Sequence, residues 1–403
     1  MMPKGATRIS DQSADLTVVS YLYGPPSAEG ICAKRLVDAL RLQGTAVQVW
    51  SAASAGARED GGDRLFPSCT WTYRKWHYLL GQLLVGAPVQ NWDFVRRVGR
   101  ETCASARVIY GRAMPLASLM AAANLAQQTS LPLGIHFSDP IPAPWHGFRH
   151  CLRWAILPVV RRLLRHAQFV TFTTEETRQY MSDLCECSLG PKSLVVHNIV
   201  PGWGRAREQG CARERSVVYI GSLAWRNPNP LVEGMARLNQ RHPKDALSLS
   251  LVGTSREWLS VTFPDVVPVR YHQFTEDVAG SYSRSSVAAV IDYDFPLYLP
   301  TKAGEAIQAG RRVLFITSPR SPSRRYFERG LQSVQFARQD PEEIEAGLRR
   351  LVEVSEEVVE GEMNARHELL YSFRPQAVAG SLWAWLCDRF PVLRAGARWP
   401  QCQ

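Results

Sequence analysis

The chain has 403 residues, 45% of them hydrophobic and 21% charged, with a formal net charge of +10. This length exceeds what one ordinary core supports, so we expect two domains, and the composition excludes general disorder. No run of about twenty apolar residues is present, so a membrane-spanning helix is not expected.

The positive charge calls for an anionic partner such as phosphate-bearing substrates or an acidic membrane surface. We expect no nucleic-acid partner, because no recognition-helix, zinc-finger or RNA-binding aromatic motif is found. The nine cysteines lack zinc-like spacing. The sequence therefore predicts a cytoplasmic protein without a metal or a cofactor, able to bind peripherally to the inner face of the membrane.

The first half of the chain alternates strand and helix patterns. Residues 1–15 are polar and lack periodicity, so we expect them to be disordered. A strand pattern at 16–23 stops at a Gly-Pro-Pro turn, and a helix pattern then opens at Gly30 and runs to Leu42. The strand pattern that follows completes a βαβ unit. Further strands are predicted at 46–50, 107–110, 131–137, 168–172 and 194–196, and a helix at 116–127.

Thr173 and Glu176 are spaced as a capping box for a helix that reaches about Leu184. Glycines and prolines among charges at 199–215 then indicate a domain boundary.

The second half repeats the alternation. Asp340, followed by a proline and two glutamates, predicts a helix start. The tail at 376–390 has helical apolar spacing with two tryptophans. Strands are predicted at 216–220, 247–252, 267–271, 287–291 and 312–316, and helices at 230–240 and from Thr275 and Thr301.

We predict an α/β protein with two facing Rossmann-like doubly wound parallel-sheet domains and an interdomain cleft. The predicted domains are residues 1–205 and 206–372. Residues 373–403 are expected to form a C-terminal helix that packs back on the first domain.

Two stretches of the second half resemble the donor domain of GT-B glycosyltransferases, closest to glycosyltransferase family 4 (glycosyltransferase group 1). They are Val217-Val218-Tyr219-Ile220-Gly221-Ser222-Leu223 and the helix and strand from Leu299 to Leu314. His197-Asn198 is similar to the end of that family's acceptor domain. The resemblance implies transfer of a sugar from a nucleotide-sugar donor to a glycan or lipid-linked acceptor in polysaccharide or glycoconjugate biosynthesis.

The chemistry of a donor pyrophosphate fits several residues of the second half. Gly221 in the Gly221-Ser222 turn lets the backbone approach a phosphate, and Arg226 offers a forked cation, unless it is a solvated loop arginine. Thr301 and Lys302 open a helix whose N–H groups suit phosphate; the alternative is capping by Thr301 with Lys302 in solvent.

By resemblance, Glu305 accepts hydrogen bonds from the ribose hydroxyls, for which its two acceptor oxygens are suited. The alternative is a helix-surface glutamate near the positive helix end.

One departure from the family concerns the donor sugar. Leu297 occupies the position where the family often has a second glutamate, and Asp292 or Asp294 are candidates to replace it. The resemblance implies a mechanism that retains the anomeric configuration and needs no metal. Asp292-Tyr293-Asp294 fits the spacing of a metal-binding motif and is a weak competitor to this interpretation.

On the acceptor side, the resemblance assigns His136 to contact with the transferred sugar; the alternative is a structural histidine. Asp139 is an alternative base or a turn residue before proline. Glu29 and Gly30 are expected to border the acceptor.

Basic residues and tryptophans interleave at 145–167 and 71–84, which is typical of an anionic membrane surface contact as well as of an ordinary packed helix. Pro158 is expected to kink or interrupt the first of these helices. A different class of function also stays open: a non-catalytic GT-B-like protein that binds nucleotide or glycan.

Overall fold

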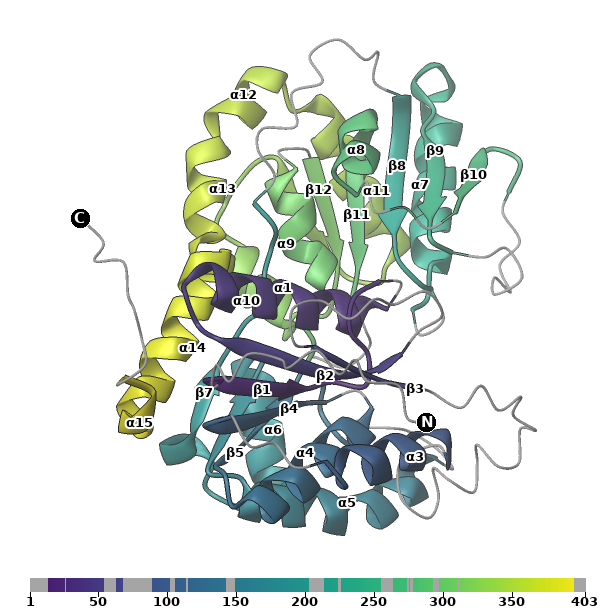
Figure 1. The fold of residues 1–403 in the computed structure, drawn as a ribbon. Helices are drawn as coiled ribbons and strands as arrows, with labels where there is room; N and C mark the ends of the chain where they lie inside the picture. Colours follow the sequence, from purple (N-terminus) through teal and green to yellow (C-terminus); the bar gives the residue numbers. More distant parts are fainter. Residues whose placement is uncertain are drawn as a thin grey trace, which may run out of the picture. The chain divides into compact units, whose positions relative to one another are not determined.

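The computed structural model describes fourteen stretches of the chain, which Figure 1 draws in colour. For residues 53, 67, 89–91 and 149–155 the structure describes the backbone alone. The stretches are 14–25, 27–53, 63–67, 89–101, 106–113, 115–142, 149–202, 214–223, 226–254, 264–273, 275, 278–292, 297–309 and 312–394.

The chain divides into two compact units. The first comprises Met1–Asn198 with Pro375–Gln403, and the second comprises Ile199–Arg374. Asp15, in the stretch expected to be disordered, is buried and accepts a hydrogen bond from the amide of Ala46 at 3.1 Å. Residues 1–13 lie outside the described part of the chain.

The first unit is built on a parallel sheet of seven described strands in the order β3-β2-β1-β4-β5-β6-β7. Central β1 is buried along its whole length and pairs with β2 on one side and β4 on the other. The strands are β1 (Leu16–Val19), β2 (Val47–Ala53), β3 (Arg64–Pro67), β4 (Val108–Arg112), β5 (Leu133–Phe137), β6 (Phe169–Phe172) and β7 (Ser193–Val195).

Helices cover both faces of this sheet. In Figure 1, α1 and α14 lie on one face, where they pack together, and α3, α4 and α5 lie on the other. The helices are α1 (Ala28–Leu42), α3 (Val89–Val98), α4 (Leu116–Thr129), α5 (Arg149–His166), α6 (Glu175–Cys185), the short η1 (Gly190–Lys192), α14 (Pro375–Arg389) and α15 (Pro391–Arg394).

The second unit has a parallel sheet of six described strands in the order β10-β9-β8-β11-β12-β13. Two apolar clusters, one on each face, hold its helices to the sheet. The strands are β8 (Glu214–Ile220), β9 (Ser248–Val252), β10 (Val269–His272), β11 (Ser285–Ile291), β12 (Arg312–Ile316) and β13 (Val334–Ala337).

On one face of the second sheet, α7 and α11 pack together, and the other face is covered by α8, α9, α10 and α13. The helices are α7 (Asn229–Arg241), η2 (Pro243–Asp245), α8 (Val278–Arg284), α9 (Thr301–Gln308), α10 (Pro322–Phe327), α11 (Pro341–Glu353), α12 (Glu356–Gly361), α13 (Met363–Leu369) and η4 (Tyr371–Phe373).

Both sheets therefore run 3-2-1-4-5-6 from the edge, with β7 added to the first sheet. This is the doubly wound order of the Rossmann fold, as predicted. The strand order reverses between β1 and β4 and again between β8 and β11, and ligands of such sheets bind outside the carboxyl ends of the strands at these switch points.

Two local predictions need correction. The cap of α6 is Thr174, which accepts a hydrogen bond from the amide of Thr177, and not Thr173 with Glu176. Thr173 is unavailable because its hydroxyl donates to the carbonyl of Ser138 at 2.6 Å.

The second correction concerns Pro158, which neither ends nor interrupts α5 as an element. Proline removes one helical hydrogen bond, but Ile156, Leu157 and Val160 around it are buried in the core, and this packing keeps the segment helical. In the described part of the chain, no helix combines the length and apolarity that crossing a bilayer requires.

Candidate functional site

The turn after β8 is shaped by Gly221. Its φ of +130° lies where side-chain-bearing residues are rarely found. The amide of Gly221 donates to the carbonyl of Val252 at 2.9 Å, and its own carbonyl accepts from the hydroxyl of Thr254. The turn is thereby tied to the neighbouring strand β9.

Arg226 bridges the ends of two strands. Its Nε donates to the carbonyl of Ile291 at the end of β11, and its Nη1 donates to the carbonyl of Ser222 after β8, both at 2.8 Å. The guanidinium therefore lies at the switch point of the second sheet, in a fixed orientation. It is half-buried, which does not fit the alternative of a freely solvated loop arginine.

The start of α9 brings three predicted residues together. Thr301 and Lys302 are its first residues, and the N-cap is Pro300, which has no side chain that could cap the helix. Lys302 Nζ lies 2.6 Å from Glu305 Oε2, and the Glu305 side chain is fully buried. A buried carboxylate requires a partner of this kind, so Glu305 is not the helix-surface glutamate of the alternative interpretation.

Two tyrosines connect Glu305 to the β8 side of the second unit. Burial raises the pKa of Tyr282 well above its usual value, and the nearby Glu305 and Tyr219 raise it further. The hydroxyl of Tyr219 donates to the carbonyl of Ser222 at 3.0 Å. Glu305, the turn at Ser222 and Arg226 thus belong to one region of this unit.

Asp292 lies buried in a network of hydroxyl groups. It is 2% exposed, and it accepts hydrogen bonds from the hydroxyls of Thr317, Ser321 and Ser323. Burial raises the pKa of its carboxyl, and these hydroxyls and Arg226 lower it. Both oxygens are engaged in joining the ends of β11 and β12 to α10. Asp294, the other candidate replacement for the glutamate, lies outside the described residues, as does Tyr293.

In the first unit, a buried ion pair lies at the carboxyl ends of the strands. Arg112 at the end of β4 donates through Nη2 to Glu29 Oε1 at 3.3 Å, and their side chains are 2% and 12% exposed. Burial raises the pKa of Glu29, against the lowering effects of Arg112 and the hydroxyl of Ser138. Arg112 Nε is buried and has no hydrogen-bond partner among the described residues.

His136 on β5 is 1% exposed, and its Nδ1 lies 2.8 Å from the hydroxyl of Thr171. Burial, with Arg112 nearby, holds the pKa of His136 well below its usual value. Nε2 is buried, again without a hydrogen-bond partner in the described part of the chain. Thr171 also bonds the hydroxyl of Tyr110, whose pKa burial raises to about 12. His136 is therefore a neutral imidazole inside a polar network.

Gly30 belongs to the same end of the first sheet. A Cβ at Gly30 would lie 2.2 Å from the carbonyl oxygen of Gly24, which approaches this closely because the Gly24 amide donates to the Gly30 carbonyl. The glycine thus sets the path into α1, where Ser27 is the N-cap. Asp139 is half-buried after β5.

Arg112, Tyr110 and Thr171 were not identified from the sequence. Arg112 could have been identified as a cation at the carboxyl end of a strand, but the predicted strand ended at Tyr110, two residues too early. His197 donates from Nδ1 to the carbonyl of Thr173 at 2.9 Å, so the end of β6 is joined to the segment before the second unit.

The basic segment at 145–167 is described only in part, and 71–84 lies outside the described residues. Within α5, Leu163 and Ile156 are buried in the core, which is the ordinary packing alternative for these two positions. Arg161 pairs with Glu186 at 2.8 Å, whereas Arg162 and Arg165 are exposed.

No protein-family model matches the sequence, and no curated protein matches it. Solved structures do match. HepE of Anabaena in complex with UDP-glucose has a TM-score of 0.66 at 16% identity, over 93% of this chain and 99% of that one. Sucrose-phosphate synthase from Thermosynechococcus elongatus gives 0.68 at 16% identity, over 94% and 100%. A glycosyltransferase from Rickettsia africae gives 0.63 at 10% identity, over 96% and 100%. These matches show that the chain has the GT-B fold.

Proposed function

We propose that the protein is a glycosyltransferase that moves a sugar from a nucleotide-sugar donor to a glycan or lipid-linked acceptor. The observation that carries the proposal is the arrangement at the switch point of the second sheet. There a positive-φ glycine turn and a bridging arginine meet, and in the same region the first turn of a helix pairs a half-buried lysine with a buried glutamate. Among the similar structures, HepE is in complex with UDP-glucose in one and with UDP and glucose in another.

In this proposal the donor domain comprises residues 206–372. Gly221 and Ser222 offer backbone groups to the pyrophosphate, and the guanidinium of Arg226 donates to phosphate oxygens. Thr301 and Lys302 add the positive end of α9 and a point charge.

Glu305 accepts the ribose hydroxyls in the donor complex. Its carboxylate is held at 2.6 Å from the ammonium of Lys302, so charge and position are set before the donor binds. Movement of Lys302 toward the pyrophosphate would release acceptor capacity on Glu305 for a vicinal diol.

The acceptor domain comprises residues 1–205, with the helix in 373–403 as part of its body. Glu29 and Gly30 border the acceptor, and His136 contacts the transferred sugar, with Asp139 as an alternative base. Arg112 joins this set because its ion pair orients Glu29. Because Nε2 of His136 is buried, it can contact the sugar only if the polar network around it opens when the substrate binds. Catalytic hydrogen bonds often form fully only in the substrate complex.

We further propose that the reaction retains the anomeric configuration and requires no metal, so that catalysis consists of positioning and of stabilising the leaving pyrophosphate. Exposed Arg162 and Arg165 support a peripheral contact with anionic membranes on the cytoplasmic side, in polysaccharide or glycoconjugate biosynthesis.

The test is incubation of the protein with a panel of nucleotide-sugars, with and without chelator, followed by detection of the released nucleoside diphosphate. We expect release from one donor, undiminished by chelator. Binding without release by any donor would favour the non-catalytic nucleotide- or glycan-binding alternative. Vesicle flotation tests the membrane contact: binding to anionic vesicles at low salt, lost at high salt, is expected, and absence of binding at low salt would contradict it.

A further inference from the structure

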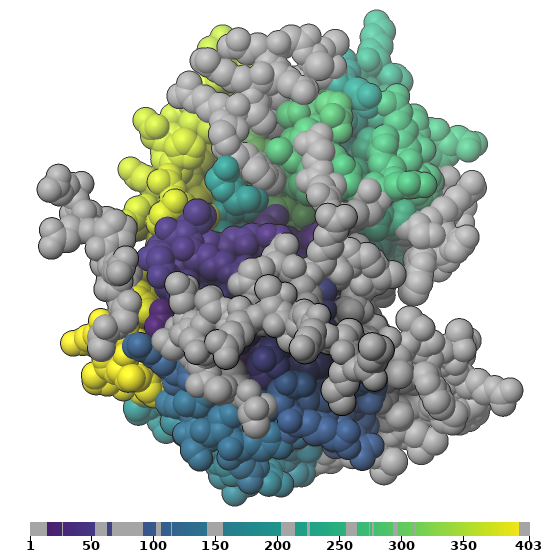
Figure 2. Space-filling model, in the orientation of Figure 1, coloured from purple at the N-terminus to yellow at the C-terminus, as the bar shows by residue number. Residues whose placement is uncertain are grey.

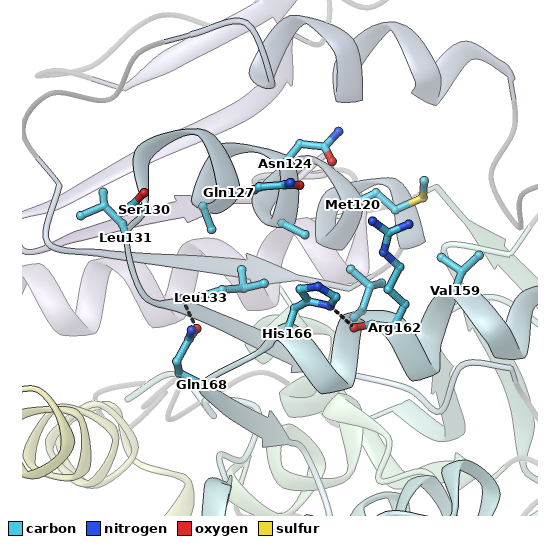
Figure 3. A pocket seen from close by; sticks show the side chains of 13 residues that line it. Met120, Asn124, Gln127, Ser130, Leu131, Leu133, Val159, Arg162, His166 and Gln168 are labelled. Atoms are coloured by element: carbon cyan, nitrogen blue, oxygen red, sulfur yellow. Dashed lines mark hydrogen bonds between the residues drawn. The ribbon is translucent and has the colours of Figure 1, made fainter.

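A cavity of about 430 Å³ lies between α4 and α5 in the first unit, as Figure 3 shows. This volume falls within the roughly 300–1,000 Å³ typical of small-molecule sites. Leu133, the first residue of β5, and Gln168, just before β6, lie at its floor. The cavity is therefore at the amino ends of these strands, at the opposite edge of the sheet from His136, and it is separate from the candidate acceptor site.

The walls of the cavity are mainly apolar. Met120 and Ala123 contribute from α4, and Val159 and Leu163 contribute from α5, with Leu131 between the helix and the strand. Four of these, Met120, Ala123, Leu131 and Val159, are only partly buried although they pack on the core. Apolar side chains left partly open along one hollow favour an apolar occupant.

One cation lines the cavity without a counter-charge. Arg162 extends from α5 toward α4 in Figure 3, and among the described residues its guanidinium has no ion-pair partner. Neither the sequence of α4 nor that of α5 contains an acidic residue. The cavity thus combines apolar walls with an uncompensated positive charge, which complements an anionic head group.

Five other polar side chains line the cavity, and two of them are engaged in hydrogen bonds within the protein. The Gln168 side chain accepts from the amide of Leu133 at 2.7 Å, and His166 Nδ1 bonds the carbonyl of Arg162 at 2.8 Å. Asn124, Gln127 and Ser130 are exposed at the rim. A sugar or an extended peptide requires many polar partners inside the site, and these walls offer few, so both are disfavoured.

We propose that this cavity binds a single-chain carboxylate amphiphile, such as a long-chain fatty acid, with the chain between α4 and α5 and the carboxylate on Arg162. The apolar walls take the chain because its transfer from water is favourable, and the arginine fork suits a carboxylate.

The proposal is tested by titrating the full chain with cis-parinaric acid, a fluorescent long-chain fatty acid, below its micelle concentration. We expect saturable binding at one site per chain. Arg162→Gln should weaken it by about tenfold, as loss of one charge-assisted hydrogen bond implies. Ala123→Phe should abolish it, because the added ring fills the hollow. Arg165→Gln is the matched control on the same helix, outside the cavity lining, and should leave binding unchanged.

Two competitors separate the possible occupants. Oleate should displace parinarate, and a cationic amphiphile with a dodecyl chain should not. Equal displacement of parinarate by both competitors, or absence of saturable parinarate binding, would overturn the proposal. A protein that binds anionic vesicles but not monomeric parinarate would overturn it as well. If Ala123→Phe fails to fold, Arg162→Gln decides, because its exposed side chain leaves the core intact; unchanged affinity in this variant contradicts the assigned head-group contact. The titration contains no nucleotide-sugar, so its outcome is independent of the proposed transferase activity.

Discussion

At the residue scale, Arg226 combines two tasks in one side chain. The carbonyls of Ser222 and Ile291 orient the planar guanidinium, which also carries the positive charge that a phosphate requires. A cation oriented in this way needs little reorganisation when a phosphate arrives. The sequence predicted the charge at this position, but it contained no information on the two carbonyls that orient it.

Arg226→Lys tests this geometry. Lysine keeps the charge but cannot hold both carbonyls while it contacts phosphate, so we expect affinity for the nucleoside diphosphate to fall by about tenfold or more. Thermal shift against nucleotide concentration measures the loss. Arg237→Lys is the control and should behave as the wild type, because Arg237 lies on α7 in an exposed ion pair with Glu342 of α11. Equal affinities in all three proteins would contradict the assigned role.

His136 gives a pH dependence with a defined sign. Burial holds its pKa well below 6.5 in the folded chain, whereas the unfolded chain protonates near 6.5. The unfolded state therefore binds more protons as the pH falls below about 6.5, and stability is lost at up to about 1.4 kcal/mol per pH unit.

His136→Gln removes this titration. The stability difference between wild type and variant, measured by urea unfolding, should shrink between about pH 7 and pH 5. Glu29 and the other carboxylates are present in both proteins, so their titrations largely cancel in the difference. A difference that stays constant over this range would mean that His136 is charged or exposed in the folded protein.

At the element scale, most strands were predicted, including the edge strands β7 and β10, whereas β3 and β13 were missed. β8, β9, β11 and β12 carry apolar runs that are buried on both faces, which is the pattern of central parallel strands. β3 and β13 have four residues each, and β3 ends in a proline at the sheet edge. Their apolar patterns are therefore too short to distinguish them from loop segments.

Capping shows the same division between local and tertiary information. Asp340 was predicted as the N-cap of α11, and its side chain does accept from the amides of Glu342 and Glu343. The cap of α6 was wrong by one residue, because Thr173 is recruited by Ser138 from a distant part of the chain. A pattern of adjacent residues cannot report such competition.

Gly30→Ala tests how the start of α1 is packed. The new Cβ would meet the Gly24 carbonyl at 2.2 Å, and backbone on both sides of the contact must shift. We expect a loss of about 1–3 kcal/mol in stability and a lower melting temperature. Gly190→Ala in the same unit adds a Cβ with nothing within 4 Å and should be nearly neutral. Similar melting temperatures for both variants would contradict the close approach.

At the scale of the whole molecule, the doubly wound fold was predictable because each half repeats the strand–helix alternation. The donor-side residues could be named because they follow the carboxyl ends of parallel strands, which share one edge of a sheet. The Arg112–Glu29 ion pair could not be predicted, because the two residues are 83 positions apart in sequence and neither lies in a motif that points to the other. The cavity between α4 and α5 likewise arises only from packing.

The central claim is that the second unit carries a nucleoside diphosphate site built around Glu305. Isothermal titration of the full chain with UDP, GDP, ADP and dTDP measures this directly. We predict one-to-one binding of one of these nucleotides, weakened by about tenfold or more in Glu305→Ala, as loss of hydrogen bonds to a carboxylate implies. Glu345→Gln, which alters another buried glutamate paired with an arginine in the same unit, should bind as the wild type does. Binding of none of the four nucleotides, or undiminished binding in Glu305→Ala, would contradict the account.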